Sequence, residues 1–461
     1  MKMQLAEIAH AVGAINDFEK WRSVSVTSVA FDSRHLQPGG LFIPLTGEQD
    51  GHKFIQSAID HGAVATLWAR DLATAPAGFP VIQVADSLKA LQDLAQYYLS
   101  KINPRVVAIT GSNGKTTTKD MIAAILSTQF NVTKTHANFN NEIGVPMTVL
   151  SIEPNTEMLV VEMGMDRPGQ LDFLSKLVSP DLAVITMIGE AHIEFFGTRD
   201  RIADAKMEIT HGLSDDGIFV YNGDEPLLQE RAADLTQRQV TFGQNDDNDL
   251  AATAIQGTAT ATTFTTNQWP DLTFTIPMIG TYNVNNALAA LAVGNVYRIR
   301  PENAQRALQT VNLTENRAEW LKSTTGAAIL SDVYNSNPTA VKEVLAAFSK
   351  TPVTGKRYVV LGDMLELGDQ ADAMHAGLAT AIDPAAISHV YLVGPHMVAL
   401  QQALAKQAPD LAVSHYESAD LATLSADLQA ILTPADQILL KGSHGIHLEQ
   451  VLAALQDSTE N

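Results

Sequence analysis

The sequence contains no cysteine, which excludes disulfide bonds, thiolate zinc sites and a cysteine nucleophile, and fits a reducing compartment. Basic residues are scarce, because 30 Lys and Arg stand against 51 Asp and Glu and give a formal net charge of -21 at pH 7. A surface of that charge repels phosphate backbones and anionic membranes. Nucleic-acid binding is therefore disfavoured, and any phosphorylated ligand needs a dedicated local site.

Long apolar runs are also missing, since none reaches membrane-spanning length. The first residues, MKMQLAEIAHAV, predict an amphipathic helix rather than a signal peptide, because Glu7 and His10 interrupt the apolar pattern. We therefore expect a cytoplasmic protein without nucleic-acid partners and without membrane insertion. A monomer is the expected state, although the sequence leaves the oligomeric state open.

The chain is long enough for several domains, because 461 residues exceed what one hydrophobic core usually organises. The amphipathic pattern SLKALQDLAQYYLSK and the turn INPR place a first boundary near residue 100. Residues 101–313 alternate apolar runs with helical patterns, which is typical of a largely parallel sheet, and a threonine-rich stretch at 258–280 predicts an antiparallel excursion. The same alternation returns at 314–461. The predicted fold class is α/β with three domains, at 1–100, 101–313 and 314–461.

The sequence VVAITGSNGKTTTKD, at 106–120, is an apolar run that enters a glycine-rich turn and then a helical pattern. Such a turn aims backbone N–H groups and a helix N-terminus at one point, which makes a phosphate site. Lys115 would add a positive charge at the β- and γ-phosphates, and the Thr116 hydroxyl could ligate Mg²⁺. The spacing departs from the strict P-loop, because Ile109 stands where that pattern has its first glycine, and a glycine-rich turn with a solvated lysine is the alternative. The candidate nucleotide-binding residues of the loop are Gly111, Ser112, Asn113, Gly114, Lys115, Thr116 and Thr117.

Three further polar residues stand at positions suited to chemistry, each with a plainer alternative. Glu162 ends the apolar run MLVVEMG, where a carboxylate can take Mg²⁺ beside bound phosphates or face solvent. His192 follows the next predicted strand, DLAVITMIG, and can serve a second Mg²⁺ or orient water, although a lone loop histidine is more often structural. Lys206 lies between Asp204 and Glu208 on a predicted helix, a pattern that alone indicates a surface lysine among salt bridges.

Six motifs resemble, in this order, the Mur ligases of bacterial cell-wall synthesis: TGSNGKTTTKD, VVEMGM, GEAHIEFFG, IADAKMEI, GTYNVNNALAA and SDVYNSNPTAV. The resemblance runs nearly the whole chain. The first block, DSRHLQPGGLFIPLTGEQDGHKFIQSAIDHGAVA, and the stretches NFNNEIGVP and VVLGDMLELG are most similar to the branch that adds D-Ala-D-Ala to UDP-N-acetylmuramoyl-tripeptide. The resemblance implies an amino-terminal domain for the UDP-muramoyl peptide, a central P-loop domain for ATP, and a Rossmann-like carboxy-terminal domain for the dipeptide.

The resemblance also implies an ATP-dependent amide ligase. The substrate carboxylate would take the γ-phosphate of ATP, and the amine of D-Ala-D-Ala would attack this acyl phosphate to give the UDP-muramoyl-pentapeptide, ADP and phosphate. Lys115, the loop amides and two Mg²⁺ ions would neutralise the reactants and the transition state. The family pattern places one Mg²⁺ at Thr116 and Glu162, and the second at His192 with a carbamylated lysine that matches Lys206. The catalytic candidates are therefore Lys115, Glu162, His192 and Lys206.

Further nucleotide contacts follow from the same resemblance. Asn283 and Asn286 in YNVNNALAA match the adenine contact, since an amide both donates and accepts, although the residues alone favour helix caps. Arg317 and Asp332 match positions that reach the phosphate and the ribose of ATP from the third domain. If ATP bridges the central and carboxy-terminal blocks, their closure would complete the site and keep water from the acyl phosphate.

The remaining candidates are assigned by the resemblance to the substrates. Ser33, Arg34 and Thr46 would contact UDP, although Ser33 and Arg34 also fit a polar strand end. Asparagines in NFNNEIGVP and YNSNP would hold the muramoyl peptide and the dipeptide, although asparagine-rich loops are more often turns. These asparagines are Asn138, Asn140, Asn141, Asn335 and Asn337. One departure from the family is His444, which follows Ser443 where an arginine is usual and weakens any permanent charge there.

Three rival functions share some of these features. A ligase of this fold for another amino acid, such as the diaminopimelate- or lysine-adding Mur ligase or a folylpolyglutamate synthase, is disfavoured by YNSNP and by the first block. A nucleotide switch or transport ATPase is disfavoured by the lack of an NKxD-type guanine signature and of a membrane segment. A binding module without chemistry is disfavoured because the four catalytic candidates are intact. Lysine and diaminopimelate both stay open as the third residue of the tripeptide.

Overall fold

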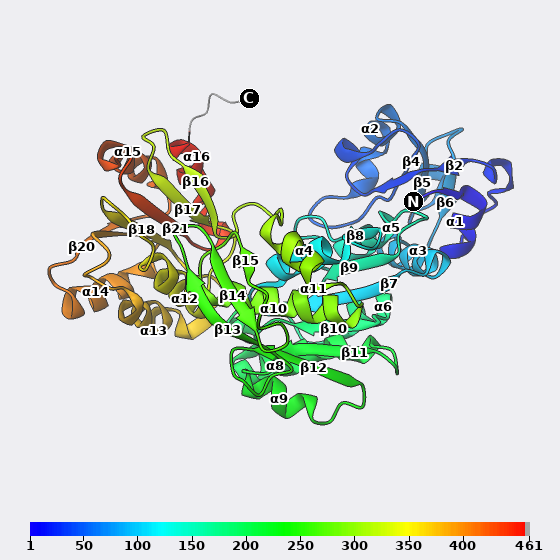
Figure 1. Cartoon of the computed structure of the whole chain (residues 1–461). Coiled ribbons are helices and arrows are strands. Elements are labelled where there is room, and N and C mark those ends of the chain that lie inside the picture. Colours follow the sequence, from blue (N-terminus) through cyan, green and yellow to red (C-terminus); the bar gives the residue numbers. More distant parts are fainter. Residues whose placement is uncertain (457–461) are drawn as a thin grey trace. The chain divides into compact units, whose positions relative to one another are not determined.

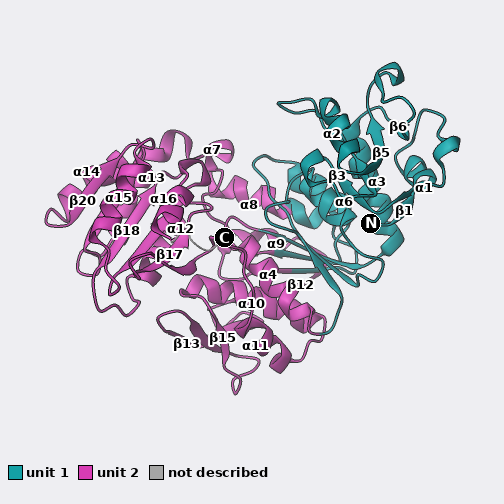
Figure 2. Cartoon of the chain, turned by 90° about the horizontal axis from the view of Figure 1, so that it is seen from above, with its two compact units in different colours: residues 1–110, 129–184, 208–219 teal, residues 111–128, 185–207, 220–461 magenta. Residues whose placement is uncertain are grey.

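A computed structural model describes residues 1–456, which divide into two compact units (Figure 1; Figure 2). Unit 1 comprises residues 1–110, 129–184 and 208–219, and unit 2 comprises 111–128, 185–207 and the chain from 220 onward. Both units contain parallel strands with covering helices, which confirms the predicted α/β class. Within residues 1–456, no helix is long and apolar enough to cross a bilayer.

Unit 1 begins with a small parallel sheet whose strands follow one another in sequence order. The strands are β3 (Ser28–Ala30), β4 (Gly40–Phe42), β5 (Ala63–Trp68) and β6 (Val81–Gln83). The short strands β1 (Met3–Gln4) and β2 (Ser25–Val26) pair antiparallel. The predicted first helix is α1 (Leu5–Ala11), which buries Leu5 and Ile8 and is therefore amphipathic, as expected. Helix α2 (Ile55–Asp60) packs against β5.

Helix α3 (Ser87–Ile102) is the amphipathic segment predicted before residue 100. Its first turn is capped by Asp86, whose carboxylate accepts a hydrogen bond from the Lys89 amide at 2.9 Å. The helix ends at Asn103, which takes a left-handed conformation (φ 53°) that asparagine tolerates better than most residues. The buried face of α3 packs against α1 and against α5 (Gly144–Leu150).

Four further strands of unit 1 lie side by side in the order β10-β7-β9-β8. They are β7 (Arg105–Thr110), β8 (Val132–Lys134), β9 (Met158–Glu162) and β10 (Leu182–Ile185), and helix α6 (Gln170–Val178) follows β9 in the chain. Strand β9 runs parallel to β7 and to β8 and is buried along its whole length, which explains its unbroken apolar run. Because Ile109 pairs with Glu162, the carboxyl ends of β7 and β9 meet at one edge of the sheet.

Unit 2 contains the glycine-rich loop and the helices that support it. Helix α4 (Lys115–Leu126) packs against α10 (Thr281–Val296) and α11 (Pro301–Gln309). Helix α10 is apolar on nearly every face because it is buried on nearly every face. Three shorter helices of this unit are α7 (Ile193–Phe196), α8 (Arg199–Met207) and α9 (Pro226–Ala232).

The antiparallel excursion predicted from the threonine-rich stretch is confirmed. The strands of this part lie in the order β15-β14-β13-β12-β11, with β13 antiparallel to β14 and β14 antiparallel to β15. Their bounds are β11 (Ile218–Asn222), β12 (Arg238–Gly243), β13 (Leu250–Gly257), β14 (Thr262–Thr266) and β15 (Phe274–Ile276). The inward side chains of Phe264 and Phe274 stack with ring centres 5.5 Å apart, which fixes the register of the last pair.

The last part of unit 2 is a six-stranded sheet in the order β16-β17-β21-β18-β19-β20. The strands are β16 (Glu319–Lys322), β17 (Ala328–Asp332), β18 (Arg357–Gly362), β19 (His389–Val393), β20 (Ala412–Tyr416) and β21 (Gln437–Lys441). All neighbours run parallel except β16, so the predicted second α/β structure is confirmed. Figure 1 shows helices on both faces of this sheet. They are α12 (Pro338–Phe348), α13 (Ala371–Ala376), α14 (Met397–Gln407), α15 (Leu421–Ile431) and α16 (Glu449–Leu455).

Candidate active site

The glycine-rich loop, Gly111–Gly114, runs directly into helix α4, as the sequence predicts. Gly114 is the N-cap of α4, with a left-handed φ of 81°, and the first amides of a helix have no acceptor within the helix. A Cβ on Gly111 would lie 1.8 Å from Thr186 Oγ1, and a Cβ on Gly114 would lie 2.2 Å from Asn286 Oδ1. Both glycines also have a positive φ, 153° at Gly111 and 81° at Gly114, so backbone conformation and close packing together favour glycine. They leave a helix N-terminus of the kind that binds phosphate.

Residues that follow β10 hold the backbone of this loop. The Ser112 amide donates to the Met187 carbonyl at 3.0 Å, and the Ser112 hydroxyl donates to the Gly189 carbonyl at 3.3 Å. The Thr186 hydroxyl donates to the Asn113 carbonyl at 2.5 Å. These contacts hold the loop from one side through protein groups alone.

Lys115 is half-buried, and its Nζ donates to the Gly111 carbonyl at 2.8 Å, so the side chain folds back over the loop. The solvated lysine of the alternative interpretation is therefore wrong. A lysine in this position carries its charge to the mouth of the helix N-terminus, which is where a phosphate would need it.

Lys206, on α8, is fully buried, so the interpretation as a surface lysine among salt bridges is wrong. Its neighbours in sequence bind elsewhere: Asp204 pairs with Arg231 at 2.7 Å, and Glu208 accepts from the Gly169 amide at 2.8 Å. Burial, and then the nearby Lys115 cation, hold the pKa of Lys206 well below its usual range. Both causes shift the equilibrium of this side chain toward the neutral amine.

His192 lies immediately before α7 in a left-handed conformation (φ 63°), and its side chain does not cap the helix. Its Nδ1 contacts a carboxylate oxygen of Glu366, and the Glu194 amide donates to the Glu366 carbonyl at 3.0 Å. The hydrogen bond with His192 holds the pKa of Glu366 below its usual range. A carboxylate on Nδ1 leaves Nε2 as the ligand atom, which is the arrangement of most metal-binding histidines. Glu366 was missed from the sequence, although it lies within the motif VVLGDMLELG.

Asn283 and Asn286 lie inside the first turns of α10 and do not cap it, so the helix-cap interpretation is wrong. The N-cap is Gly280, and no side chain caps this end. Asn283 Nδ2 donates to the Ile279 carbonyl at 2.8 Å, and Asn286 Nδ2 donates to Asn283 Oδ1 at 3.1 Å. Asn286 Oδ1 accepts from the Thr118 hydroxyl at 3.3 Å, so this amide pair lies directly against the loop helix.

Arg317 extends from the carboxy-terminal block to the loop helix. Its guanidinium donates to Thr116 Oγ1 at 3.3 Å and lies over the Tyr334 ring, 3.9 Å from the ring centre. Its Nε is buried and has no hydrogen-bond partner within the described chain. An unpaired, buried guanidinium N–H is costly unless an acceptor arrives, so Arg317 is suited to an anionic ligand.

The asparagines of YNSNP lie at the start of α12. Asn337 caps this helix by accepting from the Ala340 amide at 3.0 Å, and its side-chain amide exchanges two hydrogen bonds with that of Asn113, at 2.6 and 3.2 Å. Asn335 accepts from the Ser336 amide through its side chain. Both asparagines therefore stabilise local backbone, as the turn interpretation expects. Asn337 also holds the start of α12 against the glycine-rich loop through Asn113.

Asp332, at the end of β17, forms an ion pair with a buried lysine that the sequence did not reveal. Lys441 Nζ, at the end of β21, lies 2.6 Å from Asp332 Oδ2 and also donates to the Asn335 carbonyl at 3.0 Å. The side chain of Lys441 is 2% exposed and that of Asp332 is 16% exposed. The two strands are parallel neighbours, so the pair joins their carboxyl ends.

Lys441→Met is expected to lower the free energy of unfolding by about 3 kcal/mol, because it leaves the Asp332 carboxylate in a low-dielectric environment without its partner. Urea unfolding followed by tryptophan fluorescence measures this. The double variant Lys441→Met with Asp332→Asn removes both charges and is expected to recover most of the loss. A single variant as stable as the unmodified chain would contradict the pairing.

Glu343, on α12, is half-buried, and burial raises the pKa of its carboxyl to about 7, with Lys441 lowering it and Glu190 raising it further. Between the ordinary value of 4.5 and about 7 the folded chain therefore keeps a proton that the unfolded chain has lost. The unfolded state binds fewer protons in this window, so this group makes stability fall as pH rises through it.

Glu343→Gln is accordingly expected to stabilise the chain more at pH 8 than at pH 5, by about 2 kcal/mol, since each unit of pKa shift is worth about 1.4 kcal/mol. Urea unfolding at the two pH values measures the difference. Glu417→Gln, at an exposed carboxylate, is the matched control. Equal effects of Glu343→Gln at both pH values would overturn this account of its proton.

Glu162 lies in unit 1 and is 1% exposed, so the alternative of a solvent-facing strand end is wrong. Asn140 Nδ2 donates to Glu162 Oε1 at 2.8 Å, which brings two of the candidates together. Asn141 accepts from the Gly144 amide at 2.8 Å and therefore forms the turn before α5. Asn138 is exposed, and its carbonyl accepts from the Asn140 amide.

The UDP candidates also lie in unit 1. Ser33 and Arg34 begin a short 3-10 turn after β3, with Asp32 accepting from the Arg34 amide at 2.9 Å. The Arg34 guanidinium binds the same carboxylate at 2.6 Å, and this hydrogen bond lowers the pKa of Asp32 to about 2. Thr46 pairs through its backbone with Asp50. Arg34 is otherwise exposed, so its second face is open to a ligand.

Comparison with known families and proteins gives matches along nearly the entire chain. Family models for the Mur ligase family catalytic domain, the Mur ligase middle domain, and the Mur ligase glutamate ligase domain match residues 25–99, 109–294 and 316–444. These ranges agree in number and order with the three domains of the predicted fold class.

Among curated proteins, the UDP-N-acetylmuramoyl-tripeptide--D-alanyl-D-alanine ligase of Bacillus subtilis is 42% identical over 99% of both chains. Among solved structures, MurF from Acinetobacter baumannii superposes with a TM-score of 0.87 at 27% identity, over 99% of both chains. MurF from Thermotoga maritima in complex with ADP superposes with a TM-score of 0.79 at 27% identity, over 93% of this chain and 97% of that chain. The chain therefore belongs to the Mur ligase family.

Proposed function

We propose that this chain is the ATP-dependent ligase that adds D-Ala-D-Ala to UDP-N-acetylmuramoyl-tripeptide, in the cytoplasm and as a monomer. The products are the UDP-muramoyl-pentapeptide precursor of peptidoglycan, ADP and phosphate. The observation that carries the proposal is the 42% identity, over 99% of both chains, to the Bacillus subtilis protein of that name.

The nucleotide site is supported by the geometry of unit 2. The loop Gly111–Gly114, the open amides at the start of α4 and the folded-back Lys115 suit a triphosphate. The buried Nε of Arg317 lacks a partner within the described residues and suits a phosphate oxygen. The amide pair Asn283 and Asn286 suits adenine, and Asp332 suits a ribose hydroxyl. The Thermotoga maritima relative was solved with ADP.

The proposed metal ligands are Thr116, Glu162, His192 and Lys206. Mg²⁺ at such a site neutralises phosphate charge and polarises the γ-phosphoryl group. His192 fits, because Glu366 occupies its Nδ1 and leaves Nε2 as a ligand atom. Lys206 does not fit as an ammonium group, because a cation cannot ligate a metal ion.

Lys206 fits once its amine carries a carboxylate, and its environment favours that chemistry. The neutral amine is the form that adds to CO₂, and burial beside Lys115 lowers the pKa of Lys206 toward that form. The carbamate is an anion with two oxygens, so it would offer ligand atoms and turn the repulsion by Lys115 into attraction. We therefore infer a carbamylated Lys206 and two Mg²⁺ ions.

The three blocks divide the remaining work. In this proposal residues 1–100 bind the UDP-muramoyl peptide through Ser33, Arg34 and Thr46, and residues 101–313 bind ATP. Residues 314–461 hold the dipeptide through Asn335 and Asn337. The muramoyl peptide would also contact Asn138, Asn140 and Asn141.

The reaction proceeds in two steps. The terminal carboxylate of the tripeptide attacks the γ-phosphorus, and ADP leaves with the bond electrons, while Lys115 and the loop amides hold the charge of the transferring group. The amine of D-Ala-D-Ala then attacks the acyl carbon, the phosphate leaves, and the amine gives up a proton. The substrate carboxylate and the triphosphate are both negative and would repel each other in solution. Binding both beside the loop holds them in position to react, so the step no longer depends on a chance encounter.

An isotope experiment tests the chemistry. The tripeptide substrate carries ¹⁸O in its terminal carboxylate, and the phosphate released in the presence of ATP, Mg²⁺ and D-Ala-D-Ala is analysed by mass. The proposal expects one ¹⁸O in each phosphate, because the leaving phosphate takes one carboxylate oxygen. Unlabelled phosphate would mean plain ATP hydrolysis and would contradict the proposal. Parallel reactions that combine L-lysine or diaminopimelate with a UDP-muramoyl peptide lacking the third residue test the rival Mur ligases.

A further inference from the structure

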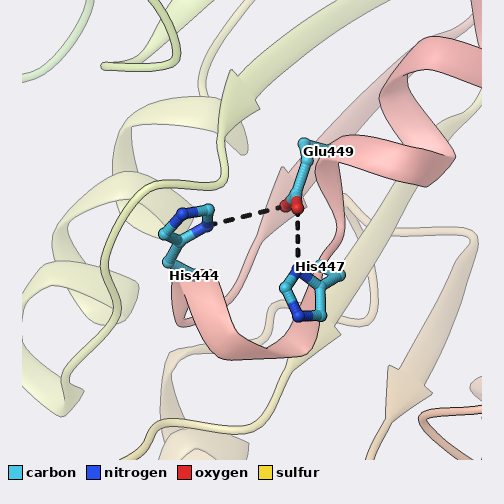
Figure 3. Close-up of side chains that lie close together, drawn as sticks. All are labelled: His444, His447 and Glu449. Carbon is cyan, nitrogen blue, oxygen red and sulfur yellow. Dashed lines mark hydrogen bonds and ion pairs between the residues drawn. The ribbon is translucent and has the colours of Figure 1, made fainter. Parts of the chain in front are cut away.

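Three side chains near the carboxyl end of the described chain, His444, His447 and Glu449, converge on one point (Figure 3). His444 and His447 belong to the turn after β21, and Glu449 is the first residue of α16. His447 Nδ1 lies 2.9 Å from Glu449 Oε1, and His444 Nδ1 lies 3.8 Å from Glu449 Oε2. The three potential ligand atoms all lie within 4.8 Å of one another.

These distances match the spacing of ligand atoms around a metal ion. Zinc binds imidazole nitrogen and carboxylate oxygen at about 2.0–2.1 Å, and a tetrahedral arrangement then separates neighbouring ligand atoms by about 3.3 Å. The two nitrogen–oxygen distances, each to a different oxygen of Glu449, lie on either side of that value. Because the three ligand atoms already lie within 4.8 Å of one another, rotation of the side chains would bring them to this spacing.

Glu449 supplies a second, independent observation. Its Oε2 is buried and has no hydrogen-bond partner in the described part of the chain, although the side chain as a whole is partly exposed. The nearest cationic or donor group with which it is paired is the His444 ring, beyond hydrogen-bond length. A carboxylate oxygen left without a donor is costly, and a cation between Glu449 and His444 removes that cost.

The backbone that presents the three ligands is anchored between them. Ile446 and Leu448 alternate with the histidines and lie in the core of the six-stranded sheet. The left-handed conformation of His447 (φ 62°) ends the turn and directs the chain into α16. The ligand positions are therefore held by the fold, while the exposed histidine rings stay accessible to an ion.

We propose that His444, His447 and Glu449 form a binding site for a zinc-class divalent ion, separate from the Mg²⁺ sites of the ligase reaction. Two imidazoles with one carboxylate suit zinc and its neighbours, whereas Mg²⁺ prefers oxygen ligands alone. Three protein ligands leave a coordination position open to water, as in exchangeable sites.

The site lies next to residues of the nucleotide site within unit 2. The His444 ring stacks on the Tyr334 ring, with centres 5.9 Å apart and planes at 14°, and Tyr334 in turn lies under Arg317. An ion bound to His444 would therefore hold in place the ring that stacks on Tyr334. Histidine at position 444 is essential to this proposal, because an imidazole binds metal, whereas the arginine that the family resemblance implies there would not.

The test is calorimetric titration of ZnCl₂ into the full chain, first stripped with chelator and then supplied with excess Mg²⁺ and ADP, so that the oxygen-rich sites are occupied. Four variants are compared with the unmodified chain. They are the double variant His444→Gln with His447→Asn, the single variant Glu449→Gln, and the controls His192→Gln and His211→Gln. Asparagine is used at 447 because it tolerates the left-handed backbone. His211 is an exposed histidine paired with one carboxylate, Asp172, and tests whether any such pair binds zinc.

The expected result is one zinc per chain that is lost in the double variant and bound about tenfold or more weakly by Glu449→Gln. His192→Gln and His211→Gln should keep it. A double variant that titrates like the unmodified chain would overturn the site, as would loss of the same zinc in His192→Gln. Circular dichroism of each variant checks that the fold is unchanged, which the exposure of both rings leads us to expect.

Discussion

Lys115→Ala is expected to lower kcat by about 10²–10³ while leaving the fold intact. Its ammonium lies at the mouth of the loop, held over the Gly111 carbonyl, and negative charge develops on the oxygen between the β- and γ-phosphates as the γ-phosphoryl group transfers. An interaction that strengthens in the transition state appears in kcat, whereas one made equally with bound ATP would appear in KM.

Steady-state kinetics, ADP binding and thermal unfolding of the variant separate these effects. Lys89→Ala is the matched control, because Lys89 is an exposed helical lysine paired with Asp93 four residues on. The control should keep full turnover. Unchanged turnover in Lys115→Ala would show that Lys115 does not stabilise the transition state of phosphoryl transfer.

Lys206→Ala is expected to lower kcat by about 10²-fold or more, because it removes the amine that we infer to carry a carbamate ligand. The substitution also leaves a buried space. A small carboxylic acid such as acetate or propionate should enter that space, replace the missing oxygen ligand and restore part of the activity.

Lys206→Met is the matched control, since methionine removes the amine but fills most of the volume. It should be as inactive as Lys206→Ala and should not respond to the acid. Full activity of Lys206→Ala would rule out the carbamate, and equal rescue of both variants would show that the acid acts elsewhere. Activity of the unmodified chain should also fall when dissolved CO₂ is removed.

The alternation of apolar runs and helical patterns was enough to predict both α/β parts and the antiparallel excursion. Strands buried on both faces, such as β9, leave unbroken apolar runs, and the inward and outward alternation of β14 leaves a period of two. The loop before α4 was also predictable from the sequence, because its glycines, its lysine and the helix that follows are neighbours in the chain.

The partners of the candidate residues were not predictable in this way, because they come from distant parts of the chain. Lys441 reaches Asp332 across 109 residues, through the pairing of β17 with β21. Glu366 reaches His192 across 174 residues. A helical charge pattern placed Lys206 on the surface, and only the packing of α8 shows that it is buried.

Local sequence patterns gave wrong predictions for polar side chains that the fold buries in apolar surroundings. Asn283 and Asn286 have the composition of a helix cap, but they lie within α10 and bond to one another. Glu162 has the position of a solvent-facing strand end, but it is buried. Polar groups buried at some cost in stability are typical of functional sites, which is why local rules fail there first.

The most direct test of the proposed ligase is to measure phosphate release and product mass together. The purified chain is supplied with ATP, Mg²⁺ and UDP-N-acetylmuramoyl-tripeptide, with and without D-Ala-D-Ala. Our account predicts phosphate release that requires both substrates, and a product heavier than the tripeptide nucleotide by one dipeptide less water. Phosphate release that ignores the dipeptide, or a product that contains another amino acid, would contradict it.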